Sequence, residues 1–147
     1  TAEIIRKRVP KKLVITPLLR EEKLPSEIEG PHLDSPDVIQ IIKLLHKNQN
    51  RRHWHFSDEE NFYDLKKRME KLMLFLGKRK EENILVIGHS MATRMLIGTM
   101  VFGKDLTPDL FQKIRERMLM QNTGINVCDL VYGQWKLVTW NDHVHLG

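Results

Sequence analysis

The sequence of 147 residues predicts an α/β fold: a mostly parallel sheet flanked by helices on both faces, with a C-terminal β-hairpin. Two short apolar runs, Leu13 to Ile15 and Ile84 to Ile87, are typical of strands buried on both faces, and helical patterns separate them. The hairpin is predicted by the alternation in Ile125 to Leu130, the turn Tyr132-Gly133-Gln134 and the return strand Trp135 to Trp140. Buried strands that alternate with helices indicate the α/β class.

The predicted helices of the first third of the chain have clear boundaries. Thr1 to Arg8 has the pattern of the end of a helix, which Pro10 terminates. Ser35 followed by Pro36 is an N-cap residue with proline at the first helical position, and it predicts a helix to about Lys47. Between these helices, the sequence from Lys23 to Leu33 predicts a loop, because Pro25, Gly30 and Pro31 interrupt it.

Three further helices are predicted in the rest of the chain. Ser57-Asp58-Glu59-Glu60 has the pattern of a capping box, with Ser57 as the cap, and Gly77 ends the helix that follows. Its apolar face is formed by Phe62, Leu65, Met69, Leu72, Met73 and Leu76. The second follows Ser90, which can cap it, and ends near Gly103; the third starts at Thr107-Pro108-Asp109. Its inward residues are Leu110, Ile114 and Met118, with Phe111 as a further candidate.

The composition limits the class of protein. A hydrophobic fraction of 41% and a charged fraction of 29% are those of a soluble globular protein, and the length suits one domain, residues 1–147. No apolar run reaches membrane-spanning length and no signal-peptide pattern opens the chain, so we expect no membrane partner. Cys128 is the only cysteine, which excludes an intrachain disulfide and predicts a reducing, cytoplasmic location.

The net charge of +5 is modest and spread along the chain. It predicts a solvated basic surface, with attraction for anionic substrates next, and no nucleic-acid partner, because aromatic residues do not interleave with the basic clusters. His53 and His55 would share one face of an extended segment. A metal site needs more ligands than these two histidines, so we expect no metal.

The segment that organises the chain is the Gly88-His89-Ser90 turn between a buried strand and a helix. In open α/β sheets, ligands bind beyond the carboxyl ends of the strands, where helices begin. The free amides and the dipole of a helix N-terminus favour an anion there. A histidine at this position can donate a hydrogen bond to a phosphate oxygen or take part in proton transfer. Alternatively, His89 only closes the turn.

Gly88-His89-Ser90-Met91-Ala92 is also similar to the nucleophile elbow of α/β-hydrolases, Gly-x-Ser-x-Gly, with Ala92 in place of the last glycine. In that serine hydrolase, Ser90 is the nucleophile. The orienting acid is Asp129 or Asp142 and the base is His143 or His145. Only 57 residues follow Ser90, too few for the strands and helices with which that family places its acid and base.

A second resemblance extends over nearly the whole chain. Thr1-Ala2-Glu3-Ile4-Ile5, Leu19-Arg20-Glu21 with Glu29-Gly30, and Glu60-Asn61-Phe62 with Arg68 are each similar to a segment of the histidine phosphatase superfamily, the phosphoglycerate-mutase-like proteins. Val86-Ile87-Gly88-His89-Ser90 resembles the second histidine motif of that superfamily. Asn122 to Ile125 and Trp135 to Leu146 resemble the closing hairpin and tail of the superfamily. The five segments occur in the family's order, and together they are fairly specific.

One departure from the family's pattern is important. The nucleophile of the family is a histidine in an Arg-His-Gly motif at the end of the first strand, and this sequence contains no Arg-His-Gly. Arg52-His53 is followed by Trp54 and lies after the Leu-x-Glu segment, so it does not match that motif. We therefore expect a domain that is N-terminally incomplete, in which the first strand precedes Thr1. The fragment alone is then expected to be inactive and to expose apolar sheet edges that favour a homo-oligomer or aggregation.

The resemblance implies a phosphatase or phosphomutase that acts on a phosphate monoester through a phosphohistidine intermediate. It implies catalytic roles for His89, which stabilises the phosphoryl group, and for Glu21, which protonates the leaving oxygen, with Glu22 as the alternative acid. Ser90 would offer its backbone N–H to the phosphate, and no cofactor is needed. The substrate would be a phosphorylated small molecule, chosen by the loops Lys23 to Leu33 and Lys47 to Phe56. A non-catalytic regulatory or binding domain on the same fold is the alternative.

Overall fold

A computed structural model describes residues 1–30 and 32–147 of the chain. Position 31, which falls in the predicted loop from Lys23 to Leu33, lies outside the described residues. The helices are α1 (Ala2–Arg8), α2 (Pro36–Asn48), α3 (Phe62–Gly77), α4 (Ser90–Phe102) and α5 (Pro108–Arg117). The strands are β1 (Ile125–Val131) and β2 (Gln134–Asp142), and short 3-10 helices are η1 (Pro17–Leu19), η2 (Ser26–Ile28), η3 (Gly103–Asp105) and η4 (Val144–Leu146). Helices and a β-hairpin thus combine in an α/β protein.

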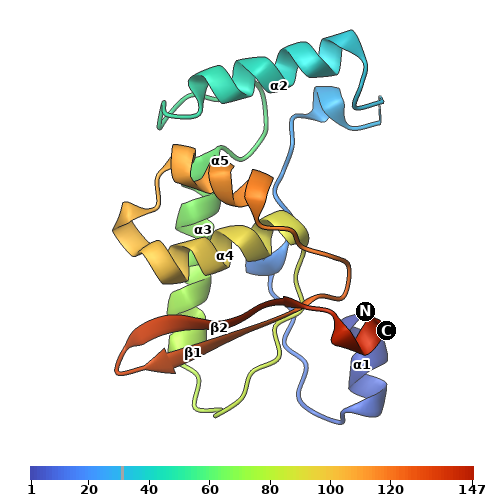
Figure 1. Ribbon diagram of the computed structural model, residues 1–147, viewed down its shortest axis with the longest axis vertical. Helices are drawn as coiled ribbons and strands as arrows, with labels where there is room; N and C mark the ends of the chain where they lie inside the picture. The colour runs from blue at the N-terminus through green and yellow to red at the C-terminus, as the bar shows by residue number, and fades with distance from the viewer. Residues whose placement is uncertain (31) are drawn as a thin grey trace.

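The core lies where α3 and α4 pack together. Leu65, Met69 and Leu72 of α3 and Met95 of α4 are at most 1% exposed, and Phe111 and Ile114 of α5 join them. Figure 1 shows α4 between α5 and the β1–β2 hairpin, and α4 contacts both. Burial of one such side chain contributes about 1.5–3 kcal/mol, so α4 is held from several sides. Its N-terminus is therefore fixed relative to α3.

Most predicted helix boundaries are confirmed. α2 begins at Pro36 after Ser35, α5 begins at Pro108 after Thr107, and α3 ends at Gly77. The predicted apolar face of α3 is also confirmed, since Leu65, Met69, Leu72 and Leu76 are buried while Phe62 and Met73 pack against them. The two starts depend on the fixed φ of a proline at the first helical position and, at α5, also on the Thr107 side chain, which accepts the Leu110 amide.

The predicted start of α3 is wrong. Asn61, not Ser57, is the N-cap, and its side chain accepts hydrogen bonds from the amides of Tyr63 and Asp64. Glu59 instead turns back and accepts from the amides of Phe56 and Ser57. A carboxylate that accepts hydrogen bonds from the amides of two preceding residues closes a turn. The helix therefore begins later than the Ser57 pattern predicts.

The C-terminal hairpin is confirmed. β1 and β2 pair antiparallel, with Leu130 opposite Trp135 and Val131 opposite Gln134. Tyr132 and Gly133 form the turn with φ values of 51° and 78°, the backbone conformation that suits a two-residue hairpin connection. Register shifts near Val127 bend β1, and Trp135 of β2 packs against the core.

The predicted parallel sheet is not seen in the described residues, where the two-stranded hairpin is the only sheet. Leu13 to Ile15 and Ile84 to Ile87 lack regular secondary structure, and no backbone hydrogen bond joins either segment to another part of residues 1–30 and 32–147. A strand needs a hydrogen-bonded neighbour, and these two segments have none here. Several of their apolar side chains are accordingly exposed, Ile15 at 82% and Leu85 at 71%.

Helix α2 lies at one end of the molecule, away from the α3–α5 core (Figure 1). Its packing is chiefly against η2, with Val38 and Ile28 buried. Across the ranges 1–30 and 32–147, none of the helices combines the length and the apolar character required to cross a membrane.

Candidate functional site

The N-terminus of α4 presents His89 and Ser90 to solvent. His89 is the N-cap residue, with an extended backbone (φ −121°, ψ 166°), and Ser90 is the first residue of the helix. The expectation that Ser90 caps α4 is therefore wrong, because a residue inside the first turn cannot occupy the cap position. Both residues are exposed, so the His89 ring is free to meet a ligand at this end of the helix.

His89 makes no capping hydrogen bond with its side chain, and the first-turn amides of α4 are instead accepted by the carboxylate of Glu21, a residue distant in sequence. Its Oε2 accepts the amide of Met91 at 3.1 Å and its Oε1 accepts the amide of Ala92 at 2.9 Å. Oε1 also accepts the amide of Glu22 at 2.9 Å. A carboxylate is favoured here by the free amides and by the positive end of the helix dipole. The candidate acid thus lies beside the turn that carries His89.

A close contact at Gly88 also brings the two segments together. A Cβ atom built on Gly88 would lie 3.3 Å from Thr93 Oγ1 and 3.5 Å from a Leu19 methyl. The distance to Leu19 is an ordinary van der Waals contact, and the tighter neighbour is Thr93 of α4 itself. Leu19, two positions before Glu21, therefore lies against the Gly88-His89-Ser90 turn.

The backbone around Glu21 is held by Arg68 of α3. Arg68 donates to both carboxylate oxygens of Glu60, each at 2.8 Å, and to the carbonyls of Leu18, Arg20 and Glu21. Burial acts to raise the pKa of Glu60, but hydrogen bonds and charge from Arg68, together with Lys23 and Arg20, lower it. The Glu60 carboxylate is thereby kept in its charged form, as the ion pair requires.

Arg94 supports the same helix end from the other side. It is the only charged residue of α4, and it is buried. Its Nη1 donates to Ser90 Oγ, and its Nε and Nη2 donate to the Met118 carbonyl at 3.3 and 3.2 Å. Our sequence analysis missed Arg94. The signal was present: a lone arginine four residues after Ser90, in an otherwise uncharged helix, faces the same side as that serine.

Glu22, the alternative acid, lies in a different environment. Burial raises the pKa of its carboxyl; the nearby Arg115 charge acts in the opposite direction, and Glu21 and Glu60 raise it further. A carboxyl with a raised pKa retains a proton at higher pH than usual, which suits an acid. Its side chain, however, makes no hydrogen bond to α4 in the described part of the chain, whereas that of Glu21 makes two.

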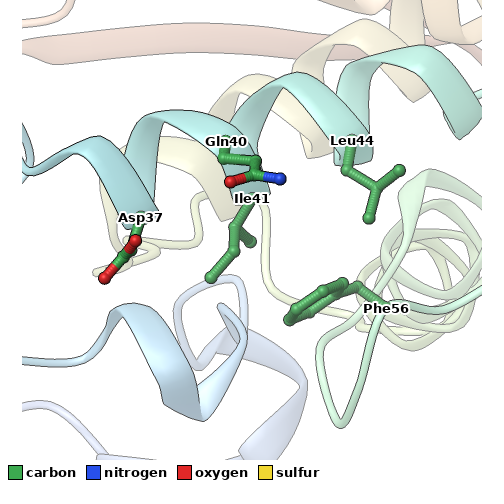
Figure 2. A pocket seen from close by; sticks show the side chains of 5 residues that line it. All are labelled: Asp37, Gln40, Ile41, Leu44 and Phe56. Carbon is green, nitrogen blue, oxygen red and sulfur yellow. The ribbon is translucent and has the colours of Figure 1, made fainter.

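One hollow in the described residues lies apart from these side chains. About 230 Å³ in volume, it lies between α2 and Phe56. Figure 2 shows Ile41 and Leu44 of α2 pointing toward the Phe56 ring, with Asp37 and Gln40 along the same helix. Apolar side chains and an acidic group do not suit a phosphate. The hollow lies beside the end of the predicted loop Lys47 to Phe56 and is separate from His89, Ser90 and Glu21.

In the part of the chain that the structure describes, Ser90, His143 and Asp142 have partners other than those of a serine hydrolase site. The Ser90 hydroxyl is bonded to Arg94, which cannot accept a proton, while His143 Nδ1 lies 2.9 Å from the carbonyl of Asn141. Asp142 accepts the amide of Val144 instead of orienting a histidine next to Ser90. Within residues 1–30 and 32–147, no group of three or more His, Cys, Asp or Glu side chains could hold a metal ion.

Comparison with known families gave a match, which covers nearly the whole chain. A family model described as histidine phosphatase superfamily (branch 1) matches residues 1–143. The chain belongs to the histidine phosphatase superfamily. Searches of curated proteins and of solved structures gave no significant match. Members of this superfamily are in general enzymes, and membership supports a phosphatase-type function in the broad sense.

Proposed function

We propose that this protein is a phosphatase or phosphomutase of the histidine type, acting on the phosphate monoester of a small molecule. The observation that carries the proposal is the Glu21 carboxylate bonded to the first turn of α4, directly after the exposed His89 and Ser90. In a member of the histidine phosphatase superfamily, this arrangement pairs an acid with a histidine at an anion-favouring helix end. No metal or cofactor is part of the proposal.

The proposed reaction has two steps. A nucleophilic histidine, which lies outside Thr1–Gly147 in this proposal, attacks phosphorus as the bond to the leaving oxygen breaks. Glu21 delivers its proton to that oxygen. Water, or an alcohol in a mutase, then attacks the phosphohistidine, giving up a proton to Glu21 and freeing the nucleophile. Dividing the transfer in this way replaces one difficult displacement by two easier ones.

His89 and Ser90 are proposed to bind the transferring phosphoryl group. The Met91 and Ala92 amides are taken by Glu21 and the Thr93 amide by the His89 carbonyl, so the Ser90 amide is the first-turn donor left for a phosphate oxygen in the described residues. A donor of this kind, aimed where negative charge develops, is typically worth about 10²–10³-fold in rate.

We further propose that residues 1–147 belong to one domain whose parallel sheet includes the segments Leu13 to Ile15 and Ile84 to Ile87. Their exposed apolar side chains, notably Ile15 and Leu85, are suited to a neighbouring strand. If that strand is not supplied by the same chain, edge pairing between copies would give a homo-oligomer. A cytoplasmic location stays a prediction from the single cysteine.

The test uses protein produced from the full reading frame, so that any residues ahead of Thr1 are present. We expect hydrolysis of p-nitrophenyl phosphate, inhibition by vanadate, and an acid-labile, alkali-stable phosphoenzyme after rapid quenching. His89→Ala is expected to lower kcat/KM by about 10²-fold or more, since it removes stabilisation of the phosphoryl group. Glu82→Ala, at an exposed position between α3 and α4, is the control.

Each alternative predicts a different result. A regulatory domain would bind phosphate or vanadate without turnover and without a phosphoenzyme. A serine hydrolase would be labelled stoichiometrically at Ser90 by a fluorophosphonate and would hydrolyse carboxylic esters. Either result would replace the phosphatase proposal.

A further inference from the structure

Arg68 has an unusually complete set of partners. A guanidinium carries five N–H donors, and all five are used: two on the Glu60 carboxylate and three on main-chain carbonyls. The residue is 8% exposed, so these bonds are shielded from water. The three carbonyls belong to Leu18, Arg20 and Glu21, at 2.8, 2.8 and 3.3 Å, and therefore include that of the proposed acid itself.

The partner of Arg68 holds the same segment from the other side. Glu60 Oε1 lies 2.7 Å from Arg20 Nη2, and Glu60 Oε2 accepts the Lys23 amide at 3.2 Å. The amide of Glu60 donates to the Lys23 carbonyl at 2.9 Å. The main chain from Leu18 to Lys23 is thus attached to Arg68 of α3 at one end and to Glu60, just ahead of α3, at the other, with Glu21 between the attachments.

The side chain of Glu21 leaves this segment toward α4. Its Oε1 accepts two amides, from Glu22 and Ala92, whereas Oε2 accepts one, from Met91. A carboxylate oxygen has two lone pairs, so Oε2 is the oxygen with a lone pair left to carry a proton. The direction of that lone pair is set by where the backbone of Glu21 stands, and the backbone is fixed by Arg68.

We infer that Arg68, paired with Glu60, is a positioning residue that aims Oε2 of Glu21 at the leaving oxygen of the substrate. The inference rests on the proposed function, because the direction of Oε2 matters only if Glu21 donates a proton to the substrate. A general acid acts over about 2.6–3.2 Å, and a displacement near 1 Å can cost about 10²-fold in rate. Loss of Arg68 frees the main chain that carries Glu21 and should impair proton delivery in particular.

The test compares two substrates of nearly equal shape in protein from the full reading frame. The leaving group of p-nitrophenyl phosphate needs little protonation, whereas that of phenyl phosphate needs more. Arg68→Met, which keeps an unbranched stem but has no donors, is expected to lower kcat/KM for phenyl phosphate at least about 10-fold more than for p-nitrophenyl phosphate. In the Glu21→Gln background, Arg68→Met should not change the ratio of the two rates further, because the proton donor is already lost.

Arg68→Lys keeps the charge beside Glu60 but cannot reach all five acceptors, so an intermediate ratio is expected, and this variant serves if Arg68→Met does not fold. Leu76→Ala, at the buried far end of α3, is the control for general destabilisation, and it should lower both rates alike.

The outcomes separate the two proposals. Equal losses on both substrates in the Arg68 variants, alongside a selective loss in Glu21→Gln, would overturn the positioning role and leave the phosphatase proposal standing. A wild-type protein that is inactive on both substrates would overturn both. A ratio changed equally by Leu76→Ala would show that Arg68 acts only through stability.

Discussion

Replacing Glu21 should destabilise the protein even before any chemistry is measured. The side chain is the cap of α4, and Glu21→Ala leaves the amides of Met91 and Ala92 without their acceptor. Loss of a helix N-cap costs about 0.5–2 kcal/mol, and loss of an anion at a helix N-terminus costs about 0.3–1 kcal/mol more. We therefore expect Glu21→Ala to lower the free energy of unfolding by about 2 kcal/mol from these two contributions. Glu21→Gln keeps an acceptor oxygen but not the charge, and should lose about 0.5–1 kcal/mol.

The assay is urea unfolding followed by far-UV circular dichroism at pH 7, with equal m-values required for the comparison. Glu82→Ala, at an exposed position, should change the free energy of unfolding by less than about 0.5 kcal/mol. Amide hydrogen exchange at Met91 and Ala92 should accelerate in Glu21→Ala. If Glu21→Ala were as stable as the Glu82→Ala control, with unchanged exchange at both amides, the assignment of Glu21 as the cap of α4 would be refuted.

Three further predictions concern stability. The pKa of Glu60 is lowered in the folded protein, so its carboxylate should stabilise the fold fully above its ordinary pKa of 4.5 and progressively less as the pH falls below that value. The difference in unfolding free energy between wild type and Glu60→Gln should therefore shrink from pH 7 to pH 3, and a constant difference would contradict this. Burial raises the pKa of Glu22, so Glu22→Gln should stabilise the protein at pH 8 and have little effect at pH 3.5, as pH-dependent urea titrations can measure. Gly124→Ala would place a Cβ atom 2.2 Å from Asn141 Oδ1, which accepts the Gln121 amide, and thermal unfolding should show a loss of about 1–3 kcal/mol. Gly77→Ala, with nothing within 4 Å of its Cβ, should instead gain about 0.4–1 kcal/mol, and equal effects at the two glycines would refute the steric argument.

Features that depend on neighbouring residues could be predicted from the sequence. The starts of α2 and α5 follow from Ser35-Pro36 and Thr107-Pro108, because an N-cap and a proline act within one turn. The hairpin follows from the alternation on either side of the Tyr132-Gly133 turn.

The start of α3 could not be predicted in the same way. Ser57 to Asp64 offers several carboxylates and caps, and partners from elsewhere in the chain decide among them. Asp58 binds Lys23 Nζ at 2.7 Å and Glu60 binds Arg68, so neither carboxylate is left to cap a helix. The predicted strands Leu13 to Ile15 and Ile84 to Ile87 are not observed in the described residues for a related reason. Strand formation depends on a partner strand and not only on the segment's own composition.

The candidate site was predictable only through the resemblance to a known family. Composition and spacing do not indicate that Glu21 and His89, 68 positions apart, lie at the same end of α4. The similarity of Leu19-Arg20-Glu21 and Gly88-His89-Ser90 to family segments did indicate it. The five hydrogen bonds of Arg68 could not be foreseen, because three of them go to carbonyls, which every sequence contains. A buried arginine chooses carbonyl acceptors according to where the backbone passes in the folded chain.

The separate position of α2 implies two levels of local unfolding within one chain. The α3–α4 pair shares the buried core, whereas α2 packs chiefly on η2 and exposes Ile39 and Leu44 along its length. Segments with few buried contacts open at a lower free energy than the global transition. Limited proteolysis should therefore cut on either side of α2 long before the core is digested, while Glu21 stays attached to α3 and α4. Variation in α2 between related proteins would then alter what approaches the molecule from that end without disturbing the helices that hold Glu21 and His89.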